Sequence, residues 1–202
     1  MMRAIRYALW GLVAIAIAVY GFMFLGARNE ARQFRPVEAS QPVTRIGGPF
    51  TLTGTDGKPF SSARMAGKPF AIFFGFTHCP DVCPTTLARL AKLRKTMGKG
   101  DDAFAILFVS VDPERDTPVE MGRYAALFGT PIIALTGSAA QIEQVKRAYG
   151  IYSAKVPQQG ADYSVDHSAA IFLMDAQGKF AATITPDEGD SAALAKLRHL
   201  IG

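Results

Sequence analysis

The chain has two cysteines, separated by three residues. Cys79 and Cys83 lie in the stretch Phe76-Thr77-His78-Cys79-Pro80-Asp81-Val82-Cys83-Pro84. Two thiols so close together could form a structural disulfide, act as a redox pair or bind a soft metal ion. A disulfide here would close a very small loop and contribute little stability, since the entropic gain grows with loop length. Redox proteins with paired cysteines commonly place two residues between them. The spacing therefore favours a metal site, with a redox pair as the alternative.

Two thiolates leave a metal site incomplete, so a third ligand is expected among the three histidines. His78 adjoins Cys79, and consecutive residues rarely both reach one metal; His199 lies on the predicted terminal helix and is expected at the surface. His167 remains. Two sulfurs and one imidazole suit three-coordinate Cu(I), and Cu(II) is a second state to consider.

Zinc stays open as an alternative metal, because it would require a fourth ligand. Asp81, between the cysteines, or Asp166, beside His167, could supply a carboxylate. Asp81 could otherwise orient the loop or simply form part of a turn.

Hydrophobic patterning predicts the elements that position these residues. A hairpin is predicted over 50–60, buried strands at 70–76 and 104–111, shorter strands at 131–135, 169–174 and 179–184, and helices from Pro84 to Gly98, from Pro118 to about Phe128, from Ser138 to Tyr149 and over 190–201. The segment 150–166 is long enough for an inserted hairpin or a loop. Strands that alternate with helices imply a parallel core, and the closing pair implies an antiparallel part. The predicted fold is α/β, a thioredoxin-like mixed sheet with flanking helices.

This topology predicts that the cysteines and His167 meet. The cysteine loop follows the carboxyl end of strand 70–76, where open α/β sheets bind ligands. Strand 169–174 should run antiparallel to strand 70–76, which brings His167 to the same end. Thioredoxin-like redox proteins usually have a cis-proline at this place, whereas this chain has Asp166-His167-Ser168. The helix N-terminus should also lower the pKa of both thiols, so both cysteines are predicted to deprotonate easily.

The N-terminal part reads as a membrane anchor. Residues Tyr7 to Gly26 are apolar and uncharged, which is the length of a transmembrane helix, although Leu25-Gly26-Ala27 could be a cleavage site. We expect an anchor at 1–26, a linker at 27–43 and a copper-binding domain at 44–202. No Arg- and Ser-rich presequence precedes the apolar run, so a bacterial inner membrane with the domain in the periplasm is expected.

The net charge of +5 comes without a basic run interleaved with aromatics, so nucleic-acid binding has little support.

Three motifs in order resemble the Sco/SenC family of copper chaperones. They are Gly75 to Pro84, then Ser110-Val111-Asp112-Pro113-Glu114-Arg115-Asp116-Thr117-Pro118, then Asp166-His167-Ser168. The resemblance covers about residues 44–202. It implies a thioredoxin-like fold, copper bound by Cys79, Cys83 and His167, and delivery of copper to the CuA centre on subunit II of cytochrome c oxidase. Some members are thought instead to reduce the cysteines of that subunit.

The sequence thus predicts a copper chaperone that is not an enzyme and that depends on an external thiol reductant. A thiol–disulfide oxidoreductase, with reductase activity as a main or secondary role, is the alternative; a peroxidase-like thiol enzyme is a third hypothesis. Asp112, Arg115 and Asp116 are interpreted as helix-capping and ion-pairing residues, with partner docking second. The scattered methionines, Met65, Met97, Met121 and Met174, are interpreted as core or surface residues and not as copper ligands.

Overall fold

The computed structural model describes residues 10, 19–20, 46–158 and 162–202. The chain divides into two compact units, 1–44 and 45–202, and the second contains nearly all described residues. In the first unit Trp10, Val19 and Tyr20 are helical. Within the described parts of the chain, no helix combines the length and apolar character required to cross a bilayer. The predicted anchor and the linker 27–43 lie almost entirely outside those parts.

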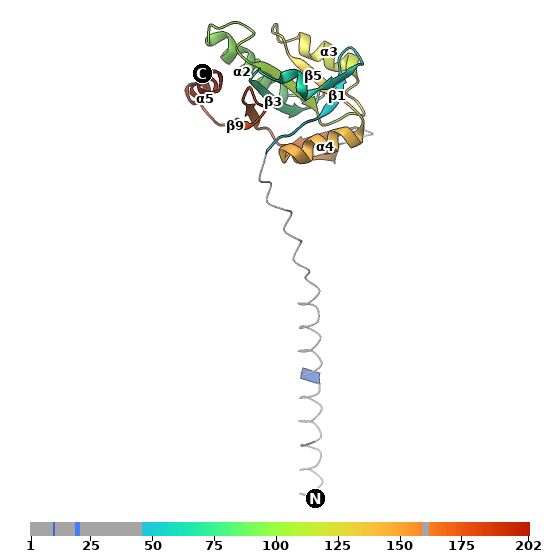
Figure 1. The fold of residues 1–202 in the computed structure, drawn as a ribbon. Helices are drawn as coiled ribbons and strands as arrows, with labels where there is room; N and C mark the ends of the chain where they lie inside the picture. The colour runs from blue at the N-terminus through green and yellow to red at the C-terminus, as the bar shows by residue number, and fades with distance from the viewer. Residues whose placement is uncertain (1–9, 11–18, 21–45, 159–161) are drawn as a thin grey trace, which may run out of the picture. The chain divides into compact units, whose positions relative to one another are not determined.

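The second unit has a central sheet flanked by helices, with a separate two-stranded sheet inserted late in the chain (Figure 1). The elements in chain order are β1 (Thr51–Gly54), β2 (Pro59–Ser61), the 3-10 helix η1 (Ser62–Met65), β3 (Phe70–Gly75), α2 (Val82–Thr96), β4 (Ala105–Ser110), α3 (Pro118–Ala126), β5 (Ile133–Thr136), α4 (Ala139–Tyr149), β6 (Ser153–Pro157), β7 (Tyr163–His167), β8 (Ile171–Met174), β9 (Phe180–Ile184) and α5 (Asp190–Ile201).

The seven-stranded sheet has the order β2-β1-β5-β4-β3-β8-β9. Strands β3, β4 and β5 are parallel, whereas β8 pairs antiparallel with β3, and β9 with β8. The register pairs Phe70 with Met174 and Phe73 with Ile171. The start of β8 therefore lies at the carboxyl end of β3, as the sequence predicted.

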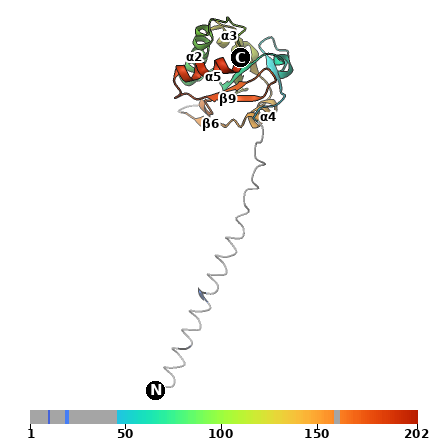
Figure 2. The same cartoon turned by 60° about the vertical axis from the view of Figure 1, so that its left-hand side comes forward.

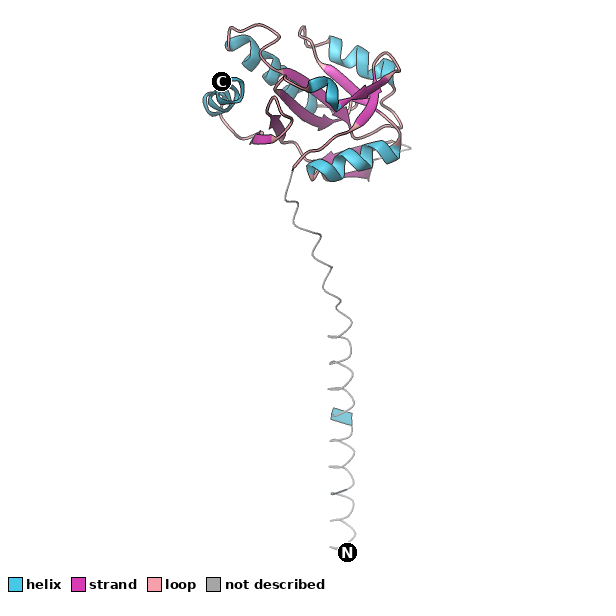
Figure 3. Cartoon of the chain, viewed as in Figure 1, coloured by secondary structure: helices cyan, strands magenta, loops and turns pink. Residues whose placement is uncertain are grey.

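Helices cover both faces of this sheet. Helices α2 and α3 lie on one side and α4 on the other (Figures 1 and 3). Because the strands β3, β4 and β5 step in one direction across the sheet, right-handed crossovers place α2 and α3 on the same face. Helix α5 contacts α2, β8 and β9, and it lies just above β9 in the turned view of Figure 2. This arrangement confirms the predicted mixed α/β sheet with flanking helices.

The core is formed mainly by the two central strands. All six residues of β3 are buried, and so are the last five of β4. Phe73 of β3 and Phe108 of β4 stack with ring centroids 6.1 Å apart. Strands with buried side chains on both faces appear as continuous apolar runs, which is why both were recognisable in the sequence.

The local signals for turns and helix ends are largely confirmed. Thr117 caps α3 by accepting from the backbone N–H of Glu120. Ser138 forms a capping box with Gln141 at the start of α4, and Gly150 ends that helix with φ +66°. The sequence left a hairpin or a loop open for the segment 150–166, and the structure shows the hairpin, formed by β6 and β7. Several element ends differ from the predicted ones by one to three residues, and one of these differences affects the site. Helix α2 begins at Val82, before the predicted Pro84, so Cys83 lies within its first turn.

We expect the buried side of α2 to contribute to the stability of this unit. Leu90 is fully buried, whereas Leu127 is 76% exposed. Leu90→Ala should lower the free energy of unfolding by about 2–5 kcal/mol through lost burial and a residual cavity. Leu127→Ala, the matched control, should change it by less than about 0.5 kcal/mol. Urea unfolding of both variants provides the measurement, and equal effects would contradict the burial described here.

Candidate metal centre

The cysteine loop forms a tight connection between β3 and α2. Its turn is closed by the backbone N–H of Cys79, which donates to the Phe76 carbonyl at 3.3 Å. Asp81, at the helix N-cap position, makes no side-chain cap to a backbone N–H. Instead, the backbone N–H of Cys83 in the first turn of α2 donates to the sulfur of Cys79 at 3.4 Å. The sulfur of Cys79 therefore occupies the acceptor position that a capping side chain normally takes.

His167 is the last residue of β7 and pairs with Ser153 of β6. The hairpin is closed beside it by two hydrogen bonds between Tyr152 and Ser168: the Ser168 N–H donates to the Tyr152 carbonyl at 3.0 Å, and the Tyr152 N–H donates to the Ser168 hydroxyl at 3.1 Å. The imidazole packs edge-on against Phe73 and Phe76, with centroids 6.0 and 5.8 Å away. The paired strand and the two aromatic rings fix the direction in which the imidazole points.

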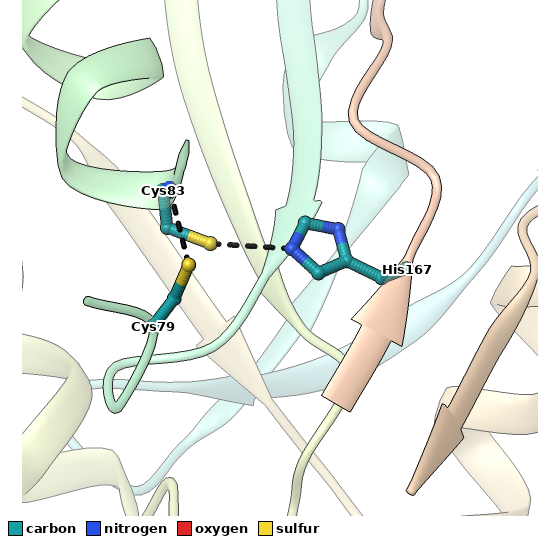
Figure 4. A group of neighbouring side chains, drawn as sticks. All are labelled: Cys79, Cys83 and His167. Atoms are coloured by element: carbon teal, nitrogen blue, oxygen red, sulfur yellow. Dashed lines mark hydrogen bonds between the residues drawn. The ribbon is translucent and has the colours of Figure 1, made fainter. Parts of the chain in front are cut away.

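The three side chains converge at one place, as Figure 4 shows. The ligand atoms of Cys79, Cys83 and His167 all lie within 4.8 Å of one another. The His167 Nε2 is 3.4 Å from the sulfur of Cys83. For a trigonal metal with bonds of about 2.0–2.3 Å, ligand atoms would be roughly 3.5–4 Å apart. The group therefore fits one small cation after movements of about 1 Å or less. The sequence predicted this convergence of the two cysteines and His167.

The imidazole of His167 already has the tautomer that a metal ligand needs. Its Nδ1 lies 3.0 Å from the Ser168 carbonyl, and a carbonyl can only accept, so Nδ1 has the proton. The lone pair is therefore on Nε2, which faces the sulfurs. Burial is the main reason that the pKa of His167 lies below its usual value. The ring is therefore neutral at neutral pH and available as a ligand.

Cys83 contradicts the prediction of two easily ionised thiols. Its side chain is fully buried, and burial raises its pKa far above the usual value, with the charge of Cys79 adding to the effect and the backbone N–H of Phe76 partly opposing it. Desolvation therefore outweighs the helix N-terminus at this position. Without a positive charge beside it, Cys83 is a neutral thiol.

Gly75 provides the space that the Cys83 sulfur occupies. A Cβ added at Gly75 would lie 2.6 Å from that sulfur and 3.0 Å from Cε2 of Phe108. Any side chain at position 75 would therefore displace the sulfur or the ring. The glycine at the end of β3 is required by close packing against a ligand, since it has no positive φ that would demand it.

Asp116 fixes the cysteine loop through hydrogen bonds from Thr77. Its buried carboxylate accepts hydrogen bonds from the Thr77 hydroxyl at 2.6 Å, the Thr77 backbone N–H at 3.2 Å and the Ser110 hydroxyl at 2.6 Å. Thr77 lies inside the turn that ends at Cys79. The interpretation of Asp116 as a capping residue was therefore incomplete: it connects β4 and the following loop to the metal-binding turn.

Asp112 and Arg115 fix the histidine hairpin, which is the β6–β7 pair that ends at His167. The buried carboxylate of Asp112 accepts from the Tyr163 hydroxyl at 2.7 Å and from Nε of Arg115 at 2.5 Å. The Arg115 guanidinium also donates to the Tyr163 carbonyl at 2.9 Å and to Asp162 at 3.0 Å, and it stacks 3.8 Å from the centroid of the Tyr163 ring. The predicted local ion pair is present, but its main effect is to attach β7, and hence His167, to the rest of the unit.

The remaining candidates lie outside the cluster of ligand atoms. His78 is exposed and contacts the Thr77 hydroxyl at 3.1 Å, and His199 is an exposed residue of α5. Asp81 is exposed and accepts from the Thr85 hydroxyl. Asp166 is also exposed. Met65, Met121 and Met174 are buried in the core and Met97 packs against it, as their interpretation as core residues predicted.

The residue that sequence reasoning missed is Tyr163. It comes from a segment whose pattern was irregular, and its partners Asp112 and Arg115 lie about 50 residues earlier. A single tyrosine in a polar loop gives no periodic signal, so only the folded hairpin could reveal this contact.

The fold and the site together define a class: a thioredoxin-like domain with a Cys-Cys-His site for a soft metal in place of a dithiol alone. The SCO1/SenC family model matches residues 38–202. The chain therefore belongs to the SCO1/SenC family.

Similar proteins agree with this assignment. The chain is 40% identical to "Protein SCO1 homolog 1, mitochondrial" of Arabidopsis thaliana over 136 residues, covering 67% of this chain and 41% of that protein. It is 34% identical to a SCO2-like protein of Rickettsia conorii, covering 77% of each chain. The structure of Bradyrhizobium japonicum ScoI with copper bound is 43% identical, with a TM-score of 0.70, and the match covers 77% of this chain and 99% of that one.

Yeast Sco1 with copper bound also shares this fold. It is 32% identical with a TM-score of 0.70, and the match covers 77% of this chain and 87% of that one. The chain spans 41% of the length of the Arabidopsis relative and 53% of yeast SCO2. The shared region is therefore the domain and not the whole of these longer relatives.

We expect Asp116 to impose a pH dependence on stability. Burial is the main reason that its pKa is raised in the folded protein, although the hydrogen bonds from Ser110 and Thr77 oppose it. A raised pKa means that the fold favours the protonated acid. The contribution of this group is fully present below its unfolded pKa of about 3.9 and is lost as the pH rises through the folded pKa. Asn cannot ionise, so the Asp116→Asn variant does not lose this contribution. The free energy of unfolding of the variant minus that of wild type should therefore increase as the pH rises.

The comparison is made by urea unfolding of both proteins between acidic and neutral pH. All other residues are the same in both proteins, so the difference reports on position 116 and on the groups that contact it. A difference that stays constant with pH would contradict the buried, proton-favouring environment described for this carboxyl.

We expect the Tyr163 hydroxyl to hold the histidine hairpin closed. Tyr163→Phe removes the hydrogen bond to the buried Asp112 carboxylate, and a hydrogen bond to a charged group is worth about 1.5–3 kcal/mol. Amide hydrogen exchange across β6 and β7 should become faster by the corresponding factor, while exchange in β3 and β4 stays slow. Tyr152→Phe, on the same hairpin but 63% exposed, is the control and should leave exchange unchanged. Equal protection in the two variants would show that this contact does not secure the hairpin.

Proposed function

We propose that this chain is a membrane-anchored copper chaperone that binds copper through Cys79, Cys83 and His167. In this proposal the metal is cargo, delivered to the CuA site on subunit II of cytochrome c oxidase. The observation that supports it most directly is the convergence of two sulfurs and one correctly protonated imidazole within 4.8 Å. Copper-bound relatives of the same fold, from Bradyrhizobium japonicum and yeast, support copper as the cargo.

The donor set favours Cu(I) over harder metals. Two thiolates and one neutral imidazole are soft or borderline ligands, and three-coordinate geometry suits Cu(I). Zinc prefers four ligands, and the nearby carboxylates of Asp81 and Asp166 are exposed and lie outside the cluster. Uptake of Cu(I) replaces two thiol protons by one cation, so binding releases protons. The same ligands also accept Cu(II), which we include as a second state.

The two cysteines differ in burial and therefore in their accessibility to a partner protein. Cys83 and its sulfur are enclosed, whereas Cys79 is only partly buried. Cys79 is therefore the sulfur that an incoming or departing partner ligand can reach first. Transfer would proceed by stepwise ligand exchange with the cysteines and histidines of the oxidase subunit, with Cys79 released or replaced before Cys83.

Copper binding requires that both thiols stay reduced. Two free cysteines within reach of each other in an oxidising compartment can form a disulfide, which has no thiolate ligands to offer. The proposal therefore includes an external thiol reductant as a partner. The same accessible Cys79 beside a buried Cys83 supports a second function, the reduction of disulfides in the oxidase subunit, as a main or secondary activity.

We further propose that residues 1–26 anchor the chain in a bacterial inner membrane and that 27–43 link the anchor to a periplasmic domain at 44–202. The uncharged apolar run from Tyr7 to Gly26 supports the anchor. The similarity to bacterial Sco proteins supports the setting. Fractionation of cells expressing the full chain, with protease applied to spheroplasts, tests both parts.

His167→Ala separates the two proposed activities. It removes one of three ligands, so Cu(I) affinity should fall by more than the roughly 10- to 100-fold typical for groups that only hydrogen-bond a ligand. Disulfide exchange by Cys79 and Cys83 should persist. The measurement is competition for Cu(I) with a chromophoric chelator, using the reduced full-length chain, together with a disulfide-exchange assay.

His78→Ala is the matched control, because His78 adjoins Cys79 but is exposed and lies outside the cluster. It should leave Cu(I) affinity nearly unchanged. Wild-type affinity in His167→Ala would remove the third ligand from the proposal and would favour the oxidoreductase.

A further inference from the structure

The end of β3 opposite the cysteine loop borders an open hollow. Phe70 begins β3 and Gly75 ends it, so the two ends of the strand lie roughly 16 Å apart. The hollow has a volume of about 540 Å³. Its walls include Phe70 and parts of three segments, which are 46–49, 61–66 and the turn 176–178 between β8 and β9. The proposed copper site gives this end of the sheet no role.

Three exposed basic side chains lie around the hollow. Arg64 belongs to η1, Lys68 to the loop before β3, and Lys179 follows the turn between β8 and β9. The Gly67 N–H donates to the Ala176 carbonyl at 2.9 Å, which joins the loop before β3 to that turn. Within the described ranges, none of the three basic residues forms an ion pair. Their charges are therefore available to a partner.

Neighbouring acidic groups do not cancel these charges. Asp175, the acidic residue of the turn, uses one carboxylate oxygen to accept two backbone N–H groups of the same turn, at 2.9 and 2.8 Å. Before β4, Asp101 is paired with Arg94. Asp102 follows in the chain, and Lys99 precedes it by three residues. This end of the sheet therefore has a net positive charge.

Phe180 adds an exposed aromatic ring to the same end of the sheet. It is the first residue of β9 and pairs with Met174 of β8, which in turn pairs with Phe70 of β3. The three residues form one row across the sheet, and the side chain of Phe180 is 38% exposed. Basic residues beside an exposed aromatic ring are typical of surfaces that lie on a membrane.

We propose that Arg64, Lys68, Lys179 and Phe180, together the basic face, dock this unit on the anionic phospholipid surface of the bilayer. The inference rests on the proposed membrane anchor. The described part of the unit begins at Ile46, which is itself a wall of the hollow. A linker of the length 27–43 spans at most about 60 Å, so the bilayer stays within reach of this face. A tethered surface has a high effective concentration, which favours the bilayer over a freely diffusing acidic protein.

Docking through the basic face also orients the metal site. Each Lys or Arg near an anionic membrane surface strengthens binding about fivefold. The cysteine loop lies at the other end of β3, and the exposed acidic residues Asp81 and Asp166 lie beside the metal ligands there. An anionic surface attracts the basic face and repels that end. Docking therefore turns Cys79 away from the lipid and toward a partner protein.

Amide hydrogen exchange of the full-length chain in lipid nanodiscs tests the docking. The discs contain phosphatidylcholine alone or phosphatidylcholine mixed with phosphatidylglycerol. In the anionic discs at low salt, exchange over 62–68 and 175–180 should slow about fivefold or more, and high salt should remove the difference.

Lys68→Glu combined with Lys179→Glu should abolish this protection. Lys58→Glu combined with Arg123→Glu is the matched control, because it reverses two exposed basic residues on the β1–β2 turn and on α3. The control should keep the protection. Protection that is lost equally in both double variants would show that only net charge matters and would overturn the assignment of the basic face.

Alkylation of Cys79 by a water-soluble maleimide reports the orientation. Its rate should be the same in both kinds of disc, because the metal site faces away from the lipid. Slower alkylation in anionic discs would place the metal site against the bilayer and overturn the inference. A chain that separates from the neutral discs defeats the proposed anchor together with the inference. A chain that stays in the discs, with equal exchange in both lipids, defeats the inference alone and would leave an acidic protein as the occupant of this face.

Discussion

Two buried carboxylates in one short loop, Asp112 and Asp116, hold the two halves of the metal site together. Asp116 accepts three donors from Thr77 and Ser110 and so fixes the turn that ends at Cys79. Asp112, with Arg115, attaches the hairpin that ends at His167. Buried charges are expensive unless they are fully hydrogen-bonded, so each carboxylate also selects one geometry for the segment that it contacts. The loop after β4 thus determines the distance between sulfur and imidazole.

The second constraint is the burial of Cys83. A thiol without a solvated surface keeps its proton, and the neighbouring imidazole is neutral for the same reason. These two buried side chains are therefore uncharged, so their burial costs little desolvation energy. A soft monovalent cation that replaces two protons leaves a net charge of −1 at this place, half the charge of two unliganded thiolates. The aromatic rings of Phe73, Phe76 and Phe108 around the ligands serve the same end, since they exclude water without offering competing donors or acceptors.

Strong periodic signals made most of the fold predictable. The runs that became β3 and β4 are apolar at every position except Ser110, because both faces of these strands are covered. The helices beginning at Pro118 and Ala139 have Thr117 and Ser138 as N-capping residues. The structure of the insertion between α4 and β8 was less predictable from the sequence. Strands β6 and β7 form a separate sheet with polar, partly exposed residues, so their sequence lacks the alternation that a half-buried strand normally shows. Contacts with the Asp112–Asp116 loop attach these strands to the rest of the unit, and no local pattern predicts such contacts.

The sequence predicted which side chains form the candidate metal site. Two cysteines, three histidines and the order of strands suffice to select Cys79, Cys83 and His167, because chain connectivity brings the end of one strand to the start of its antiparallel neighbour. The protonation states of these side chains became clear only from the folded arrangement. Burial reversed the expected ionisation of Cys83, and the Ser168 carbonyl set the tautomer of His167. Proton affinity depends on solvation and on hydrogen bonds from segments distant in the chain, and these exist only after the chain has folded.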